Sequence, residues 1–470
     1  MNLTIKNMLE ATKGTLIQGD PDTSVKNLSI DTRTIRPKDF YLPLKGENFD
    51  GHEFIYQAID KGALGFFKEK FWSNLKTEEI LENYPEINVI EVDNTLVALQ
   101  NLGRYQTAKI SPKIIGVTGS VGKTTTKDMI AQVLEEDFSI HKTKGNFNNE
   151  VGLPLTLLNL QENHELAVLE MGMSDLGEIQ TLVKLAPPNI AVITNIGSAH
   201  IQNLKSKENI LKAKLEIASE LKEGDVLLLN GDDPLLWSLR TMDTPYEKVF
   251  YGINKRNDFY PLEIREEDTG CEFQVQIAGE IRKFHIRLPG KHQIVNALSA
   301  IWIGCYYDME YKYIQQGLGK VKISDMRFET HEISKAKIIN DAYNASPESM
   351  EASIAVAKKM EGCRRILVLG DILELGEYSQ EGHRKVGSFI SKGGFHRLIT
   401  KGTDSKWIGL EAIEQGFPSE MVEHVETNKK AAELLDRLLK QEDLVLIKGS
   451  RGMKMEEIIE ILKKGRQQNA

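Results

Sequence analysis

The stretch "GVTGSVGKTTTKDMI", from Gly116 to Ile130, decides how this sequence is interpreted. It matches the sequence pattern of a phosphate-binding loop except at one position. In the common pattern a first glycine stands six residues before the lysine. Val117 occupies that place relative to Lys123. The stretch therefore predicts either a shorter variant of the phosphate loop or a tight turn with an incidental lysine.

The flanks of this stretch favour the phosphate loop. The segment "KIIGV" before it predicts a strand, and "TTTKDMIAQVLEE" after it predicts a helix. Between a strand and a helix, small residues let backbone N–H groups point at phosphate oxygens, a lysine meets the β- and γ-phosphates, and a threonine hydroxyl meets Mg²⁺. We expect a phosphate-binding loop made of Thr118, Gly119, Ser120, Val121, Gly122, Lys123, Thr124 and Thr125.

Length and composition set the broad class. A chain of 470 residues is long enough for about three domains. Its net charge of -9 argues against a nucleic-acid-binding protein, because such proteins more often carry a basic surplus. No secretion signal is visible, no apolar run reaches the ~18 residues of a membrane span, and the three widely spaced cysteines suit a reducing compartment. We expect a cytoplasmic protein that does not insert into membranes.

Apolar strands that alternate with helical periodicity predict an α/β protein. Residues 1–110 are mixed, whereas residues 111–322 contain strands such as "LAVLEMG" and "IAVITNIG", and residues 323–470 contain "RILVLGD" and "LVLIKGS". Such alternation indicates parallel sheets covered by helices. Residues 245–290 alternate polar and apolar side chains, which predicts antiparallel strands.

A GTPase is the first alternative. The stretch "NKRN" at Asn254 approaches the guanine-binding pattern NKxD, but Asn257 stands where the aspartate is needed. The stretch also falls among the predicted antiparallel strands, so we set the GTPase aside.

Two candidate ligand residues follow strands of the central segment. Glu170 ends the run "ELAVLE", and Thr194, Asn195 and His200 come after "IAVI". Open α/β sheets bind ligands at the carboxyl ends of their strands, which makes Glu170 a candidate Mg²⁺ ligand and His200 a second candidate. A surface glutamate and a structural histidine stay open as alternatives.

Lys214 lies on the apolar side of a predicted helix. In "SKENILKAKLEIASELKEGD" apolar residues form one stripe, and Lys214 is one turn from Ile210 and from Ala218. One interpretation is that the side chain extends along the apolar surface until its ammonium reaches the rim of the ligand-binding crevice at the carboxyl ends of the strands. The other is that the buried lysine does not keep its ordinary positive charge. A carbamylated lysine would be anionic and could join His200 on a second Mg²⁺.

Several stretches together resemble the Mur ligases, the ATP-dependent amide-forming ligases of peptidoglycan synthesis. They are "GVTGSVGKTT", "GNFNNEVGLPLTLL", "LEMGM", "TNIGSAHI", "KAKLEI", "LPGKHQIVNALSA" and "NDAYNASPESM". The loop of that family also lacks the early glycine. "DAYNASPESM", "LGDILELGEYS" and "KGSRGMKMEEI" are similar to one member in particular, which adds D-alanyl-D-alanine to UDP-N-acetylmuramoyl-tripeptide.

The resemblance implies three domains. They are a small α/β domain for the UDP-sugar substrate (1–110), a central P-loop parallel-sheet ATPase domain (111–322) and a C-terminal Rossmann-like α/β domain for the incoming dipeptide (323–470). It implies ATP and two Mg²⁺ as cofactors, UDP-N-acetylmuramoyl-tripeptide and D-alanyl-D-alanine as substrates, and a monomer. The reaction would pass through an acyl phosphate.

The resemblance also implies residue roles. Catalysis would rest on Lys123, Glu170, His200 and carbamylated Lys214, and the metals on Thr124, Glu170, His200 and Lys214. Besides the loop, Asn296, Arg327 and Asp341 would contact ATP. The peptide substrates would meet Asn146, Asn149, Tyr343, Asn344 and Arg451, and the UDP-sugar would meet Asp31, Thr32, Arg33, Lys45, Gly46, Glu47, Asn48 and Phe49.

Two alternatives remain. One is another ligase of the same fold, such as folylpolyglutamate synthase or a different Mur ligase, against which the C-terminal motifs argue. The other is a non-catalytic nucleotide-binding module. Glu170, His200 and Lys214 together argue against that module, because simple ATP binding does not need them.

Overall fold

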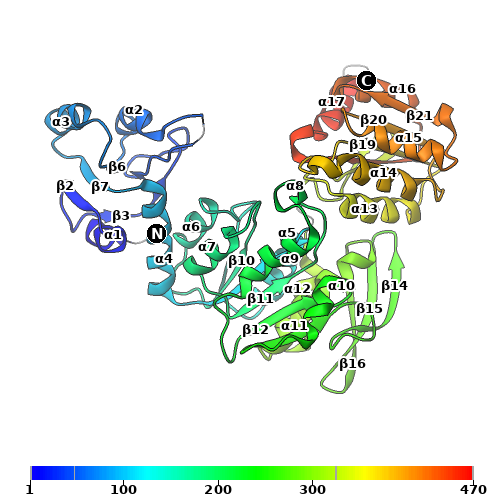
Figure 1. Ribbon diagram of the computed structural model, residues 1–470, viewed down its shortest axis with the longest axis horizontal. Helices are drawn as coiled ribbons and strands as arrows, with labels where there is room; N and C mark the ends of the chain where they lie inside the picture. The colour runs from blue at the N-terminus through cyan, green and yellow to red at the C-terminus, as the bar shows by residue number, and fades with distance from the viewer. Residues whose placement is uncertain (1–2, 47, 323–324, 468–470) are drawn as a thin grey trace. The chain divides into compact units, whose positions relative to one another are not determined.

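The computed structural model describes residues 3–46, 48–322 and 325–467 (Figure 1). The chain divides into two compact units. Unit 1 comprises Met1–Gly116, Phe138–Gly172 and Glu178–Asn189, and unit 2 comprises Val117–Asp137, Met173–Gly177 and Ile190–Ala470. In the part of the chain that the structure describes, no helix has the length and apolar character needed to cross a bilayer.

Unit 1 begins with a five-stranded sheet of order β2-β7-β6-β5-β4. The strands from β4 to β7 pair in parallel, whereas β2 pairs antiparallel to β7. Phe40, Phe67 and Ile90 of this sheet are buried with Leu99 and Leu102 of α4 in one apolar core. The elements are β1 (Leu3–Thr4), α1 (Ile5–Thr12), β2 (Thr15–Gln18), β3 (Ser24–Val25), β4 (Leu28–Ser29), β5 (Phe40–Tyr41), α2 (Ile55–Asp60), β6 (Gly65–Glu69), α3 (Asn74–Asn83), β7 (Asn88–Val92) and α4 (Thr95–Ile110).

A six-stranded sheet of order β13-β12-β11-β8-β10-β9 carries the predicted phosphate loop. Its strand β8 is common to the two units, because unit 1 ends at Gly116 and unit 2 begins at Val117. The central strands β8, β10, β11 and β12 are almost entirely apolar and buried, as expected for a parallel sheet covered on both faces, whereas the edge strands β9 and β13 are partly exposed. The elements are β8 (Lys113–Thr118), α5 (Lys123–Leu134), β9 (Ile140–Lys142), α6 (Gly152–Leu157), β10 (Leu166–Glu170), α7 (Glu178–Leu185), β11 (Ile190–Ile193), α8 (Ile201–Leu204), α9 (Lys207–Leu215), β12 (Val226–Asn230), α10 (Pro234–Trp237) and β13 (Glu247–Tyr251).

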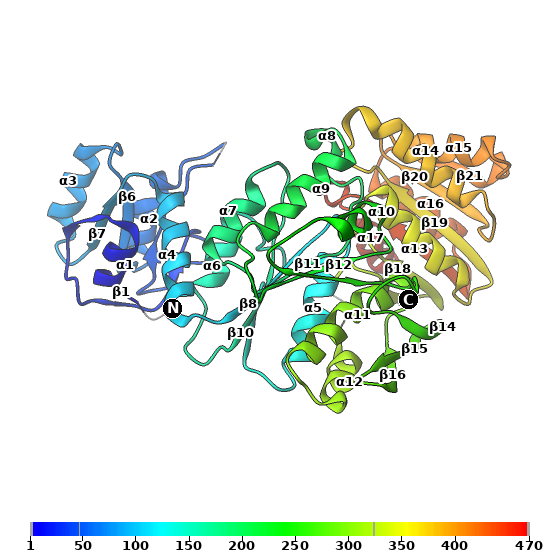
Figure 2. The same ribbon diagram turned by 60° about the horizontal axis from the view of Figure 1, so that its bottom comes forward.

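An antiparallel sheet of order β14-β15-β16 follows in unit 2. It consists of β14 (Pro261–Glu267), β15 (Gly270–Ile277) and β16 (Glu280–Ile286). Two helices, α11 (Lys291–Tyr306) and α12 (Tyr311–Lys320), pack on α5, and α12 also contacts β16 (Figure 2). The prediction of antiparallel strands is therefore confirmed for residues 261–286, whereas β13 belongs to the parallel sheet.

The last sheet has the order β17-β18-β22-β19-β20-β21. All its recorded pairs are parallel except β17 with β18. Helices cover both faces, with α13 and α14 on one and α16 and α17 on the other (Figure 1). The elements are β17 (Glu329–Ile333), β18 (Ala336–Asn340), α13 (Pro347–Lys359), β19 (Arg364–Gly370), α14 (Ser379–Ile390), β20 (Arg397–Lys401), α15 (Lys406–Glu414), β21 (Val422–Val425), α16 (Asn428–Leu438), β22 (Asp443–Lys448) and α17 (Glu456–Gln467).

The predicted α/β class with parallel sheets is confirmed. The predicted domain boundaries near residues 110 and 322 stay a prediction, because compactness yields two units and residues 323–324 lie outside the described part of the chain.

Candidate active site

The strand, glycine loop and helix predicted around Lys123 are present in the structure. Strand β8 leads into it, and α5 begins directly after Gly122, whose φ of 87° lies in the left-handed region. The N-cap residue Gly122 has no side chain to bond to the start of α5. The N-terminus of a helix after a glycine loop is a ready anion site.

The loop is held in shape by the residues that follow β11. The Asn195 side chain accepts from Val121 N and donates to Val121 O, each at 2.9 Å. The Thr194 hydroxyl donates to the same carbonyl at 2.6 Å. At Gly119 a Cβ atom would overlap the Thr194 hydroxyl, and φ is 148°, so this position requires glycine.

Lys123 and Thr124 open the helix beside the loop. The ammonium of Lys123 donates to the carbonyl oxygen of Gly119 at 2.8 Å. The Thr124 hydroxyl accepts from Arg327 Nη2 at 3.0 Å. The Arg327 guanidinium lies 4.0 Å above the ring of Tyr343. The structure thus brings together four residues that the sequence assigns to ATP or peptide binding.

Asp341 follows β18 and is held in a buried network. Its Oδ2 lies 2.6 Å from Lys448 Nζ and also accepts from the Ser353 hydroxyl, and its Oδ1 accepts from Phe328 N at 3.1 Å. Lys448 is 3% exposed and its ammonium also donates to Asn344 O at 3.2 Å. Asp341 therefore fixes the backbone next to Arg327.

Glu170 ends β10 in unit 1 and is only 2% exposed. Its Oε1 accepts from the Asn148 side chain at 2.7 Å, whereas its Oε2 is buried without a hydrogen-bond partner among the described residues. A buried unpaired carboxylate oxygen is costly unless a ligand or cation meets it. Glu170 is therefore suited to hold a metal ion.

His200 precedes α8 in unit 2 with a left-handed φ of 62°. Its Nδ1 lies 2.6 Å from Glu374 Oε2. The hydrogen bond from His200 lowers the pKa of Glu374, which keeps that carboxylate ionised.

Lys214 lies on α9 and is 1% exposed, so its ammonium does not reach a solvent-exposed rim. The pKa of Lys214 falls well below its ordinary value, first because burial removes water from the ammonium and then because Lys123 is nearby. The structure thus favours a changed charge state over the extended lysine. A neutral amine is the form that reacts with CO₂.

The residues present fit Mg²⁺ together with a phosphorylated nucleotide. In the described ranges, no three His, Cys, Asp or Glu side chains gather as a metal site by themselves. Magnesium at phosphate sites commonly takes only one or two carboxylates, with phosphate and water oxygens completing the shell. The buried, unpaired oxygen of Glu170 is a donor that fits such an ion.

Other predicted residues have the following places. Asn296 lies on α11 beside Gly122, the loop residue before α5. The exposed Asn149 accepts from Gly152 N, the first N–H of α6, at 2.8 Å, and the exposed Arg451 pairs with Glu456 at 2.6 Å. Asn146 and Asn344 are exposed as well.

In the first sheet, Asp31 lies just after β4 and binds Arg33 at 2.7 Å. The hydrogen bonds from Arg33 lower the pKa of Asp31. Thr32 is buried and its hydroxyl donates to Gln57 at 2.7 Å. Lys45 forms an isolated β-bridge with Asp50, which encloses Gly46, Asn48 and the exposed Phe49, whereas Glu47 lies outside the described residues.

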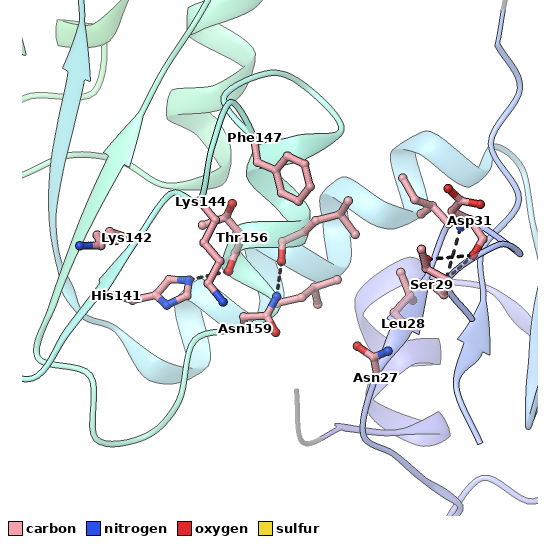
Figure 3. A pocket seen from close by; sticks show the side chains of 14 residues that line it. Asn27, Leu28, Ser29, Asp31, His141, Lys142, Lys144, Phe147, Thr156 and Asn159 are labelled. Carbon is pink, nitrogen blue, oxygen red and sulfur yellow. Dashed lines mark hydrogen bonds between the residues drawn. The ribbon is translucent and has the colours of Figure 1, made fainter. Parts of the chain in front are cut away.

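A cavity of about 430 Å³ lies in unit 1 (Figure 3). One wall comes from the residues around β4, and the other from the end of β9 and from α6. Lys142 and Lys144 make its second wall basic, whereas Phe147 offers an apolar ring. The lining residues are Asn27, Leu28, Ser29, Ile30, Asp31, Thr34, His141, Lys142, Lys144, Phe147, Leu155, Thr156, Leu158 and Asn159.

Sequence reasoning missed several residues of the site. Lys448 contacts the predicted Asp341 and Glu374 contacts the predicted His200, whereas Glu348 contacts Ser198, two residues before His200. All three come from distant parts of the chain. These three residues lie in the motifs "KGSRGMK", "LELGE" and "SPESM". The motifs were the feature of the sequence from which the residues could have been found.

Comparisons with known proteins agree with this geometry. Family models match residues 24–107 (Mur ligase family, catalytic domain), 117–304 (Mur ligase middle domain) and 326–451 (Mur ligase, glutamate ligase domain). The UDP-N-acetylmuramoyl-tripeptide–D-alanyl-D-alanine ligase of Bacillus subtilis (strain 168) is 42% identical over 463 residues, 98% of each chain. The chain belongs to the Mur ligase family.

Two solved structures of this Mur ligase family extend the likeness to the whole fold. MurF from Acinetobacter baumannii matches with a TM-score of 0.88 and 27% identity over 99% of each chain. MurF from Thermotoga maritima, in complex with ADP, matches with a TM-score of 0.81 and 28% identity, covering 95% of this chain and 99% of that one. The resemblance and the three-domain α/β architecture expected from the motifs are confirmed.

Proposed function

We propose that this Mur ligase joins D-alanyl-D-alanine to UDP-N-acetylmuramoyl-tripeptide at the expense of ATP, giving the pentapeptide product, ADP and phosphate. The match to the Bacillus subtilis ligase over 98% of both chains carries the proposal. The phosphate loop, the buried Glu170 and the buried Lys214 supply matching chemistry.

The loop residues 118–125 bind the ATP phosphates in this proposal. The ADP in the Thermotoga maritima structure supports this assignment. Lys123 places its positive charge against the β- and γ-phosphates, and Arg327 reaches the γ-phosphate from beside Thr124. Asn296 contacts adenine, and Asp341 orients Arg327 through the backbone of Phe328.

Two Mg²⁺ ions complete the site in this proposal. Thr124 would be a ligand of one ion, His200 and carbamylated Lys214 would be ligands of the other, and Glu170 would bridge or share the metals. When bound, the ions offset the repulsion between the anionic carboxylate of the tripeptide and ATP. The neutral amine of Lys214 adds to CO₂ and releases one proton, so that the side chain becomes an anionic oxygen ligand.

The reaction then has two steps. The carboxylate of the tripeptide attacks the γ-phosphorus, and ADP leaves with an acyl phosphate formed. The amine of D-alanyl-D-alanine attacks the acyl carbon, phosphate leaves, and the amine gives up a proton. Excluding water protects the acyl phosphate, so we expect the C-terminal segment to close over the loop during turnover.

Three substrate regions follow from the same proposal. Residues 1–110 bind the UDP-sugar through Asp31, Thr32, Arg33 and Lys45–Phe49, and the cavity of Figure 3 lies beside Asp31. Asn146 and Asn149 would lie near the substrate carboxylate or phosphate. Residues 323–470 bind the dipeptide with Tyr343, Asn344 and Arg451, and residues 111–322 bind ATP. A cytoplasmic location and a monomeric state belong to the proposal, and size-exclusion chromatography tests the second.

Phosphate release with ATP and Mg²⁺ tests the function. The two co-substrates are added separately and together, using tripeptides that end in lysine and in diaminopimelate. Release that needs both, with a pentapeptide product by mass, is the expected result. Release with folate and glutamate instead would assign the chain to the folylpolyglutamate synthases, and no release with any pair would leave a nucleotide-binding module.

A further inference from the structure

The segment Ser198–Lys207, which carries His200, is held by the C-terminal part of unit 2. Glu348 accepts from the Ser198 hydroxyl at 2.8 Å and from Ser198 N at 3.2 Å. The Tyr378 hydroxyl donates to Lys205 O at 2.8 Å. These contacts fix the segment on both sides of His200.

A carboxylate of the C-terminal part also holds the His200 ring. Glu374 Oε2 lies 2.6 Å from His200 Nδ1. Because an ionised carboxylate only accepts, Nδ1 carries a proton, and in the neutral ring the lone pair is then on Nε2. In many metal sites a carboxylate binds one ring nitrogen of a histidine while the other nitrogen binds the metal.

The backbone gives independent support for this pairing. His200 has a φ of 62° and Glu374 a φ of 64°. Both residues therefore have the left-handed backbone conformation, which residues other than glycine seldom adopt. Such positions persist where the surrounding structure requires them and are frequent at functional sites. Here they bring the two side chains into contact.

We propose that Glu374 is a positioning residue that fixes the His200 ring with Nε2 ready for Mg²⁺. This inference rests on the proposed function, which assigns His200 to the metal. It adds that the C-terminal part, which binds the dipeptide, contributes to metal binding in the central part. The metal site is then complete only when Glu374 is docked on Ser198–Lys207.

The pair contributes little to stability, which makes it accessible to mutation. The Glu374 side chain is 62% exposed, and exposed ion pairs contribute little to folding. Glu374→Ala should therefore fold normally. Glu377→Ala, an exposed glutamate three residues away, is the matched control, and Tyr378→Phe removes a docking contact without touching the ring.

The experiment is a Mn²⁺ titration of the full chain with a non-hydrolysable ATP analogue, followed by the electron paramagnetic resonance of free Mn²⁺. We expect two classes of site in the wild type and loss of one in His200→Ala. In Glu374→Ala the Mn²⁺ affinity of that same class of site should fall by about 10–100-fold, which is the usual effect of losing such a hydrogen-bond partner. Glu374→Gln, whose amide oxygen still accepts from Nδ1, should recover part of the affinity, and Glu377→Ala should bind like the wild type.

Two outcomes would overturn the inference. One is an unchanged Mn²⁺ isotherm for Glu374→Ala while His200→Ala loses a site. The other is an equal weakening in Tyr378→Phe, which would show that Glu374 only docks the segment. Retention of both classes in His200→Ala would contradict the proposed metal role of His200 itself. The ligase assay on the wild type tests the reaction separately.

Discussion

At the scale of single residues, Lys123 is the charge at the centre of the phosphate loop. Lys123→Ala should lower kcat by about 10²–10³-fold, because one preorganised positive group facing the transferred phosphoryl is lost. Phosphate release with all substrates present measures the effect. Lys184→Ala, an exposed lysine of α7, should leave the rate unchanged. Normal turnover in Lys123→Ala would contradict the assigned role.

Lys214 should give the protein a pH-dependent cost in stability. Its pKa is lowered from 10.5 in the folded chain, so above the folded value the unfolded chain binds a proton that the folded chain lacks. Stability therefore rises with pH up to about 10.5. In CO₂-free buffer at pH 7, Lys214→Met should raise the melting temperature by about 2–4 °C, which corresponds to about 1 kcal/mol.

Thermal unfolding between pH 7 and 10 checks this prediction. The advantage of Lys214→Met should shrink as the pH rises. Lys212→Met, on the exposed side of the same helix, should show no such trend. A variant that is less stable than the wild type at pH 7 would mean that the amine is charged and paired.

The pair of Lys448 and Asp341 should matter for folding. Both side chains are largely buried, with 4% and 12% of the side chain exposed. Lys448→Ala should lower the free energy of unfolding by about 3–5 kcal/mol, because the Asp341 carboxylate would be left buried and unpaired. Urea unfolding measures it. Lys430→Ala, which breaks an exposed pair with Glu426, should change it by less than about 0.5 kcal/mol.

Residues differ in how far their surroundings can be predicted from the sequence. The burial of Lys214 was predictable, because its place in an apolar stripe is a local property of one helix. The partners of His200 and Asp341 were not, because Glu374 and Lys448 are more than 100 residues away along the chain and their contacts depend on the tertiary fold.

At the scale of elements, the turn between β8 and α5 depends on close backbone contact. Gly119→Ala should weaken nucleotide binding by at least about 10-fold, because the new methyl group would overlap Thr194 and displace the loop. A fluorescent ADP analogue measures the affinity. Gly319→Ala has open space around its Cβ and should bind like the wild type. Equal affinity in Gly119→Ala would show that the loop adapts.

The elements themselves were largely predictable. Buried parallel strands are continuous apolar runs, so β8, β10, β11, β19 and β22 fall where the sequence indicates. Element ends were less predictable. Helix α9 ends at Leu215 and continues as a short 3₁₀ turn, although the apolar stripe extends to Leu221. Periodicity shows which face is buried but not where backbone hydrogen bonding changes.

At the scale of the whole molecule, Arg327 joins the C-terminal part of unit 2 to the phosphate loop. Its hydrogen bond to Thr124 and its stacking on Tyr343 need a planar guanidinium. Arg327→Lys should lower kcat by about 10²-fold through misplacement of the γ-phosphate, with little change in unfolding temperature. Arg437→Lys, on the exposed side of α16, is the control for steady-state kinetics. A normal kcat in Arg327→Lys would show that Arg327 is an ordinary linker residue without a role at the γ-phosphate.

The chain alternates between its two compact units, and this limits how the protein can be divided into fragments. The chain passes from one unit to the other after Gly116, Asp137, Gly172, Gly177 and Asn189. A single cut therefore cannot yield one fragment for each unit. Attempts to express the units as independent pieces, or to exchange one between homologues by a single crossover, should give insoluble protein.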